Sequence, residues 1–119
     1  MNLKEKEEFM IVLEKSWGLG SNLKWTEENK AKGQCGVTSL VVNDYFGGDI
    51  LKTKDKDNFW HFYNLIDDTL VDFTKSQYDK IPNYDNVLSN RDEALADTNG
   101  EQYSYLTSQV KINILNEVY

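Results

Sequence analysis

The chain contains one cysteine, and its surroundings are typical of a catalytic nucleophile. Cys35 follows Gly33-Gln34 and precedes Gly36, at the predicted start of a helix. A helix N-terminus carries unpaired N–H groups and a partial positive charge, which favour the thiolate. The glycines leave room for a sharp turn and an approaching carbonyl, and the Cys35 N–H would face a developing oxyanion. The alternative is a small, buried, structural cysteine, the more common role of a lone cysteine.

The single histidine, His61, is the expected base, and Asp72 is the acid expected to orient it. They lie on two consecutive predicted strands, residues 59–66 and 69–74, which are rich in β-branched and aromatic side chains. Cysteine, base and acid in this order make a generalised triad, in which the thiolate attacks, the imidazole carries the proton and the carboxylate fixes the tautomer. Each residue alone also has a structural reading: a hydrogen-bonded strand histidine and a solvated acid.

The triad depends on the turn between the two strands. If Asp67-Asp68 forms a two-residue turn, His61 pairs with Thr74, and His61 and Asp72 lie on one face. They are then diagonal neighbours, about 7–8 Å apart at Cβ. A three-residue loop would place them on opposite faces. Asp-Asp is a weaker turn signal than Asp-Gly.

The remaining elements follow from hydrophobic periodicity. Helices are expected over residues 4–16, from about 35 to 46, and from about 101 onward, and a further strand over 50–53. The C-terminal stripe consists of Tyr103, Leu106, Val110, Ile114 and Val118. Residues 75–100 are expected to be a loop with a short helical turn. The pattern predicts a single α+β domain over residues 1–119, with N-terminal helices, a small antiparallel sheet and a C-terminal helix.

Composition excludes several classes of protein. The 119 residues carry 13 Lys+Arg and 20 Asp+Glu, a net charge of −7 without a basic cluster, which argues against nucleic acid as a partner. One cysteine cannot form an internal disulfide, and one cysteine with one histidine is too few for a zinc cluster. No apolar run is long enough for a membrane span, and the charged residues 4–8 do not suit a signal peptide. We therefore expect a soluble cytoplasmic protein.

Longer segments around these residues resemble the small bacterial YunG-like proteins. The resemblance covers about half of the chain, from Trp25 to Tyr78, and rests on residues 33–42, 45–51, 61–64 and 72–78. More distantly, a cysteine at a helix start followed by His-x-aromatic-Asn and Asp-x-Thr is similar to the papain-like superfamily, including its transglutaminase-like branches. That likeness implies a papain-like core with Cys35 as nucleophile, His61 as base and Asp72 as orienting residue.

The resemblance also implies an oxyanion donor. In papain-like enzymes a side-chain amide six residues before the nucleophile often has this role, and Asn29 occupies that position. Gln34, next to the nucleophile, is a rival donor, and Asn29 could instead cap a helix or turn. The chain is much shorter than typical papain-like enzymes, which leaves little material for a substrate cleft.

The function expected from these observations is a thiol-dependent hydrolase or acyltransferase that acts on an amide, peptide or isopeptide bond, or deamidates glutamine. Its substrate would be a peptide, a protein or a small amide, with no cofactor and no metal, and the chain would be a monomer or homodimer. The alternative is a catalytically inactive papain-like module that binds a protein or peptide. A third reading, a metalloprotein, would require Asp44 or Asp49 beside His61.

Overall fold

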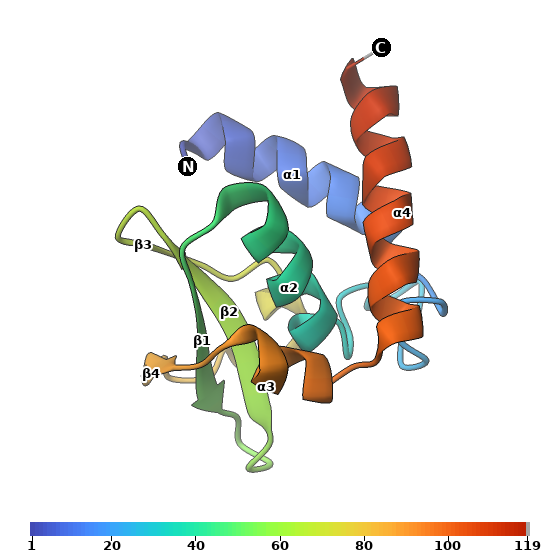
Figure 1. Cartoon of the computed structure of the whole chain (residues 1–119). Helices are drawn as coiled ribbons and strands as arrows, with labels where there is room; N and C mark the ends of the chain where they lie inside the picture. The colour runs from blue at the N-terminus through green and yellow to red at the C-terminus, as the bar shows by residue number, and fades with distance from the viewer. Residues whose placement is uncertain (119) are drawn as a thin grey trace.

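The computed structural model describes residues 1–118 and has an α+β architecture, as predicted (Figure 1). The elements in chain order are α1 (Leu3–Ser16), α2 (Cys35–Phe46), β1 (Asp49–Lys54), β2 (Trp60–Ile66), β3 (Thr69–Val71), the 3-10 helix η1 (Lys75–Gln77), β4 (Val87–Leu88), α3 (Arg91–Ala96) and α4 (Gly100–Val118). The three predicted helices are therefore confirmed within a residue or two at their ends.

Helix α2 lies at the centre of the fold. Figure 1 shows it between the sheet on one side and α1 and α4 on the other. Its first eight residues, from Cys35 to Val42, are all buried. A helix with small or apolar residues on every face has to be enclosed on every face, and this composition explains the central position. The indole N–H of Trp17, which follows α1, donates to Thr38 Oγ1 at 2.9 Å and ties the end of α1 to α2.

The sheet is antiparallel, with the strand order β3-β2-β1-β4. The predicted turn at Asp67-Asp68 is confirmed, because Ile66 pairs with Thr69 and both aspartates have positive φ, 49° and 64°. Two central residues with positive φ define the turn that matches the twist of a hairpin.

The third strand is shorter than predicted, since it ends at Val71. The backbone N–H of Thr74 donates to Asp72 Oδ1 at 3.1 Å, so this segment turns toward η1. The predicted pair of His61 with Thr74 is therefore wrong, and Asp72 lies just beyond the strand.

Residues 75–100, predicted to be a loop with a short helical turn, contain more regular structure than that. The segment adds β4, which pairs with β1 through Leu51 and Leu88, and α3, whose N-cap Asn90 accepts a hydrogen bond from the Glu93 N–H. Helix α3 has six residues, of which only Ala94 is buried. One buried position cannot show a hydrophobic periodicity, which is why the sequence pattern did not predict this helix.

Helix α4 packs against α1 and α2, and two positions of its predicted stripe, Leu106 and Val110, are fully buried. The side chain of Val118 lies outside the described part of the chain. Within residues 1–118 no helix has the length and apolar character needed to cross a membrane.

Candidate functional site

Cys35 is the first residue of α2, and a glycine makes this placement possible. Gly33 has φ +76°, and a Cβ there would lie 2.6 Å from Asn22 Oδ1. Only glycine fits such a turn without strain. The N-cap residue, Gln34, makes no side-chain capping bond, and Cys35 itself is 7 % exposed. The sequence prediction of a cysteine at a glycine-dependent helix start is confirmed.

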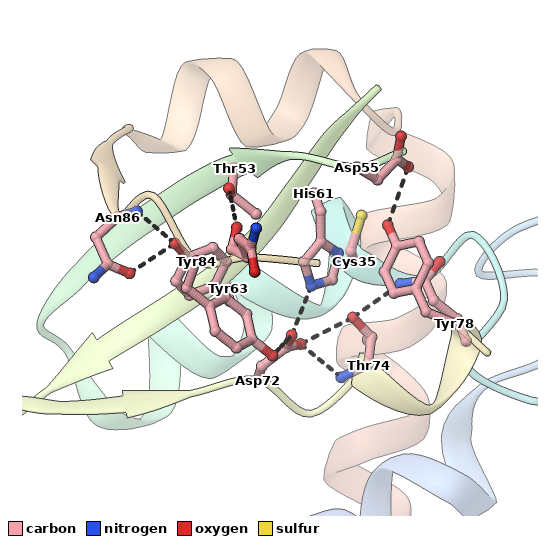
Figure 2. A network of polar contacts seen from close by, with 12 residues as sticks. Cys35, Thr53, Asp55, His61, Tyr63, Asp72, Thr74, Tyr78, Tyr84 and Asn86 are labelled. Atoms are coloured by element: carbon pink, nitrogen blue, oxygen red, sulfur yellow. Dashed lines mark hydrogen bonds and ion pairs between the residues drawn. The ribbon is translucent and has the colours of Figure 1, made fainter. Parts of the chain in front are cut away.

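His61 and Asp72 meet as predicted, although Asp72 lies beyond the strand. His61 Nε2 is 2.7 Å from Asp72 Oδ2, and the two side chains are 0 % and 7 % exposed (Figure 2). A carboxylate can only accept a hydrogen bond, so the nitrogen in this contact, Nε2, is the one that carries a proton when the imidazole has a single N–H. Nδ1 then carries the lone pair, and it is the nitrogen that can act as a base.

The Asp72 carboxylate is held by more than the histidine. Tyr84 donates its hydroxyl to Oδ2 at 2.8 Å, and Thr74 donates its backbone N–H and its hydroxyl to Oδ1 at 3.1 and 3.3 Å. Burial and the bond to Asp72 raise the pKa of Tyr84 above its usual range, which keeps the phenol a donor. Both carboxylate oxygens are thus satisfied, and the orientation of the group is fixed.

Aromatic rings enclose the imidazole of His61. Tyr63 stacks on it with a centroid distance of 5.9 Å, and Tyr78 meets it edge-on at 5.0 Å. Nδ1 is buried, and in the described part of the chain it has no hydrogen-bond partner. A buried acceptor without a donor costs about 1–3 kcal/mol, so such groups often mark functional sites.

The Cys35 thiol lies near this ring but is bonded elsewhere. Figure 2 draws Cys35 next to His61, and the thiol also contacts the backbone N–H of Phe62, the next residue of β2. Its hydrogen bond goes to Asp97 Oδ2, at 3.8 Å. Cys35 and His61 are therefore brought to one place, but no hydrogen bond joins them within residues 1–118.

The thiol is protonated in this arrangement. Burial and the neighbouring charge of Asp97 raise the pKa of Cys35 to about 12, and the N–H groups of Phe62 and Gly36 oppose the rise only in part. The thiolate favoured by the helix N-terminus is therefore not the resting form, because desolvation and a like charge outweigh the helix dipole.

Asp97 is the site residue that sequence reasoning missed. It is the C-cap of α3, in the segment predicted to be a loop, and it is 62 residues from Cys35 in the chain. Burial raises its pKa, and the Cys35 thiol and the Gly36 N–H counteract that rise. Neither a motif nor a spacing in the sequence links Asp97 to Cys35.

The two predicted oxyanion donors have different environments. Asn29 Nδ2 donates to the Gln77 carbonyl at 3.2 Å, and the Asn29 N–H donates to Thr26 Oγ1 at 2.9 Å, so Asn29 holds η1 in place. Gln34 is fully buried, and both polar atoms of its side chain are without a partner in the described residues. The assignment of either residue to an oxyanion stays a prediction.

The acids considered for a metal are not beside His61. Asp44 pairs with Arg91 at 3.0 Å, and Asp49 lies opposite Leu65, near the other end of β2. Across residues 1–118 no group of three or more His, Cys, Asp and Glu side chains is arranged to hold a metal ion.

A groove begins next to the site. It has a volume of about 370 Å³ and is lined by Tyr78, whose ring contacts His61, and by three lysines: Lys54, Lys56 and Lys80. Burial raises the pKa of Tyr78, and negative charges on Cys35 and Asp55 would raise it further. The Tyr78 hydroxyl donates to Asp55 Oδ2 at 3.3 Å, and Asp55 also lines the groove.

Comparisons with known proteins agree on one family. The family model described as "YunG protein" matches residues 5–114. An uncharacterised protein YunG of Bacillus subtilis (strain 168) is 48% identical over 100 residues, which are 84% of this chain and 86% of that protein. No solved structure matches the chain.

Proposed function

The chain belongs to the YunG protein family, and we propose that it is a thiol-dependent hydrolase or acyltransferase built on a papain-like core. The bond attacked would be an amide, peptide or isopeptide bond. Cys35 is the nucleophile, His61 the base, and Asp72 the residue that orients the base. The order of helix α2, strand β2 and the end of β3, each supplying one of these residues, supports the papain-like assignment.

One observation carries the proposal. The 2.7 Å contact of His61 Nε2 with Asp72 directs the free lone pair to Nδ1, which is buried and has no partner within residues 1–118. An unpaired buried acceptor is costly, and the role of a base supplies a reason for leaving Nδ1 free. A group that must accept a proton during a reaction needs a free lone pair, and Figure 2 draws the Cys35 side chain next to this ring.

The chemistry follows from these positions. Nδ1 of His61 takes the proton of Cys35 as Sγ forms a bond to the substrate carbonyl carbon, and the electron pair of the C=O bond moves to its oxygen. The C–N bond then breaks, and His61 returns the proton to the leaving amine. Water or an acceptor amine then attacks the thioester carbon as His61 removes its proton; the C–S bond breaks, and His61 returns the proton to Sγ, which regenerates the thiol.

Because the pKa of Cys35 is raised, His61 has to remove the thiol proton during the attack. A thiol with a pKa of about 12 is neutral at pH 7, so proton removal accompanies the attack rather than preceding it. The base is therefore required for reactivity. In an ordinary exposed thiol, reactivity instead follows the ionised fraction alone.

Alkylation with iodoacetamide tests this proposal. The chain has a single cysteine, so all thiol labelling reports Cys35, and Cys35→Ser gives the blank. Sγ bonds to the methylene carbon, iodide leaves, and the thiol proton passes to His61. We expect His61→Ala to slow labelling at pH 7 about a hundredfold, the usual contribution of a general base.

Two controls keep the result interpretable. Circular dichroism establishes that each variant is folded at the assay temperature, and His61→Gln offers a second, more polar replacement for this buried position. Equal labelling rates for wild type and both folded His61 variants between pH 6 and 9 would refute a base at position 61.

The second candidate is a catalytically inactive papain-like module that binds a protein or peptide. The observation in its favour is that the thiol donates to Asp97 and not to His61, and that Cys35 is 7 % exposed. In such a module Cys35→Ser would leave partner binding unchanged. For the enzyme the same substitution would abolish turnover.

A further inference from the structure

The contact between Cys35 and Asp97 is built into the fold. Asp97 ends α3, and its backbone N–H donates to the Ala94 carbonyl at 3.2 Å. Ala94 is fully buried and belongs to the same apolar cluster as Cys35 and Phe62. Because α3 is anchored against α2 through Ala94, the carboxylate three residues later is held at the first turn of α2.

A glycine provides the space for this carboxylate. A Cβ on Gly36 would lie 2.3 Å from Asp97 Oδ2 and 2.8 Å from its Cβ. Any other residue would push Asp97 away, since real Cβ atoms do not approach an oxygen so closely. The missing side chain at Gly36 therefore leaves the space that the Asp97 side chain occupies.

The position of Asp97 relative to the thiol is that of a substrate contact. Cys35 is buried, whereas Asp97 as a whole residue is exposed and only its carboxylate is partly desolvated, so Asp97 lies between the thiol and the protein surface. A carbon under attack lies about 3–3.5 Å from the nucleophile. With Oδ2 at 3.8 Å from Sγ, there is room for an amide nitrogen one or two bonds from that carbon to be placed within hydrogen-bond distance of Oδ2.

We propose that Asp97 is a specificity-determining residue, which accepts a hydrogen bond from an N–H group of the substrate beside the carbon that Cys35 attacks. The site then takes substrates with a donor at this point, above all primary carboxamides, and excludes carboxylates, whose negative charge would face that of Asp97. This inference rests on the proposed function and names its substrate class.

Two alkylating reagents of the same size test the proposal. Iodoacetamide carries a primary carboxamide, and iodoacetate carries a carboxylate in its place; glutathione, measured in parallel, gives the intrinsic ratio of their rates. We expect wild type to prefer iodoacetamide about a hundredfold beyond that ratio at pH 7.5. Asp97→Asn should reduce this preference to less than tenfold, because the amide carries no charge.

Matched variants separate position from net charge. Asp92→Asn removes the same charge from the first turn of α3 and should retain the wild-type preference. Gly36→Ala displaces Asp97 without changing any charge and should lose the preference, as Asp97→Asn does. A preference unchanged in Asp97→Asn and Gly36→Ala, or lost equally in Asp92→Asn, would overturn the role of Asp97.

This result is independent of the test of His61. If the His61 substitutions do not change the labelling rate, His61 is not the base, even if Asp97→Asn changes the preference for iodoacetamide. Labelling that requires His61 but shows no preference set by Asp97 retains the enzyme and refutes the substrate class.

Discussion

Replacing Asp72 by asparagine preserves its shape and should still impair both stability and thiol reactivity. The carboxylate accepts four hydrogen bonds, from His61 Nε2–H, the Tyr84 hydroxyl, and the N–H and hydroxyl of Thr74. Asparagine has one acceptor oxygen and one NH2 group. Its NH2 must therefore face one of the two pairs of donors.

Each orientation has a definite cost. With NH2 toward Thr74, the backbone N–H of Thr74 loses its acceptor. With NH2 toward His61, the imidazole must shift its proton from Nε2 to Nδ1 to avoid two facing donors, and Nδ1 can then no longer act as a base. A buried donor without a partner costs about 1–3 kcal/mol. We therefore expect a loss of about 2 kcal/mol, which lowers Tm by about 6–12 °C in a domain of this size.

The assay pairs thermal unfolding with the rate of iodoacetamide labelling at pH 7. Asp68→Asn is the matched control, because it makes the same chemical change at an exposed turn residue with φ 64°, a conformation that asparagine tolerates. Asp72→Asn should lower Tm and slow labelling about a hundredfold, whereas Asp68→Asn should do neither. If both variants behave like wild type, Asp72 does not orient His61 and the reasoning fails.

Three further predictions concern neighbouring groups. Gly33→Ala should destabilise the protein by about 1–3 kcal/mol in urea unfolding, since φ is +76°, whereas Gly100→Ala, with open space around it, should not. The folded state holds the Cys35 proton up to a pKa of about 12, and the unfolded chain releases it near pH 9. Stability should therefore fall by about 1.4 kcal/mol per pH unit between pH 9 and 12, and this part of the fall should be absent from Cys35→Ser. Tyr84→Phe removes one donor to Asp72 and should cost about 1 kcal/mol in thermal unfolding; a stability equal to wild type would argue against that bond.

Local rules were sufficient for the elements with strong signals. The helix start at Cys35 required a glycine with positive φ, and Gly33 has one. The Asp67-Asp68 turn fixed the pairing of β2 with β3 and brought His61 to Asp72. Short elements gave no such signal: β4 has two residues and α3 has six, and both depend on contacts with β1 and α2.

The protonation state of the Cys35 thiol could not be predicted from the sequence, for a related reason. The helix dipole is a local property, and taken alone it favours a thiolate at Cys35. Desolvation and the charge of Asp97 are tertiary properties, and they dominate, raising the pKa to about 12.

The sequence by itself determined which residues can form a thiol site, because a chain with one cysteine and one histidine offers a single combination. It also reduced their alignment to two alternatives, set by the length of the turn at Asp67-Asp68, and the structure has the two-residue turn. Only the tertiary structure decided where the thiol proton lies, since α3 brings Asp97 to Cys35 from 62 residues away. Contacts between segments so distant in the chain arise from packing, which no local pattern of residues encodes.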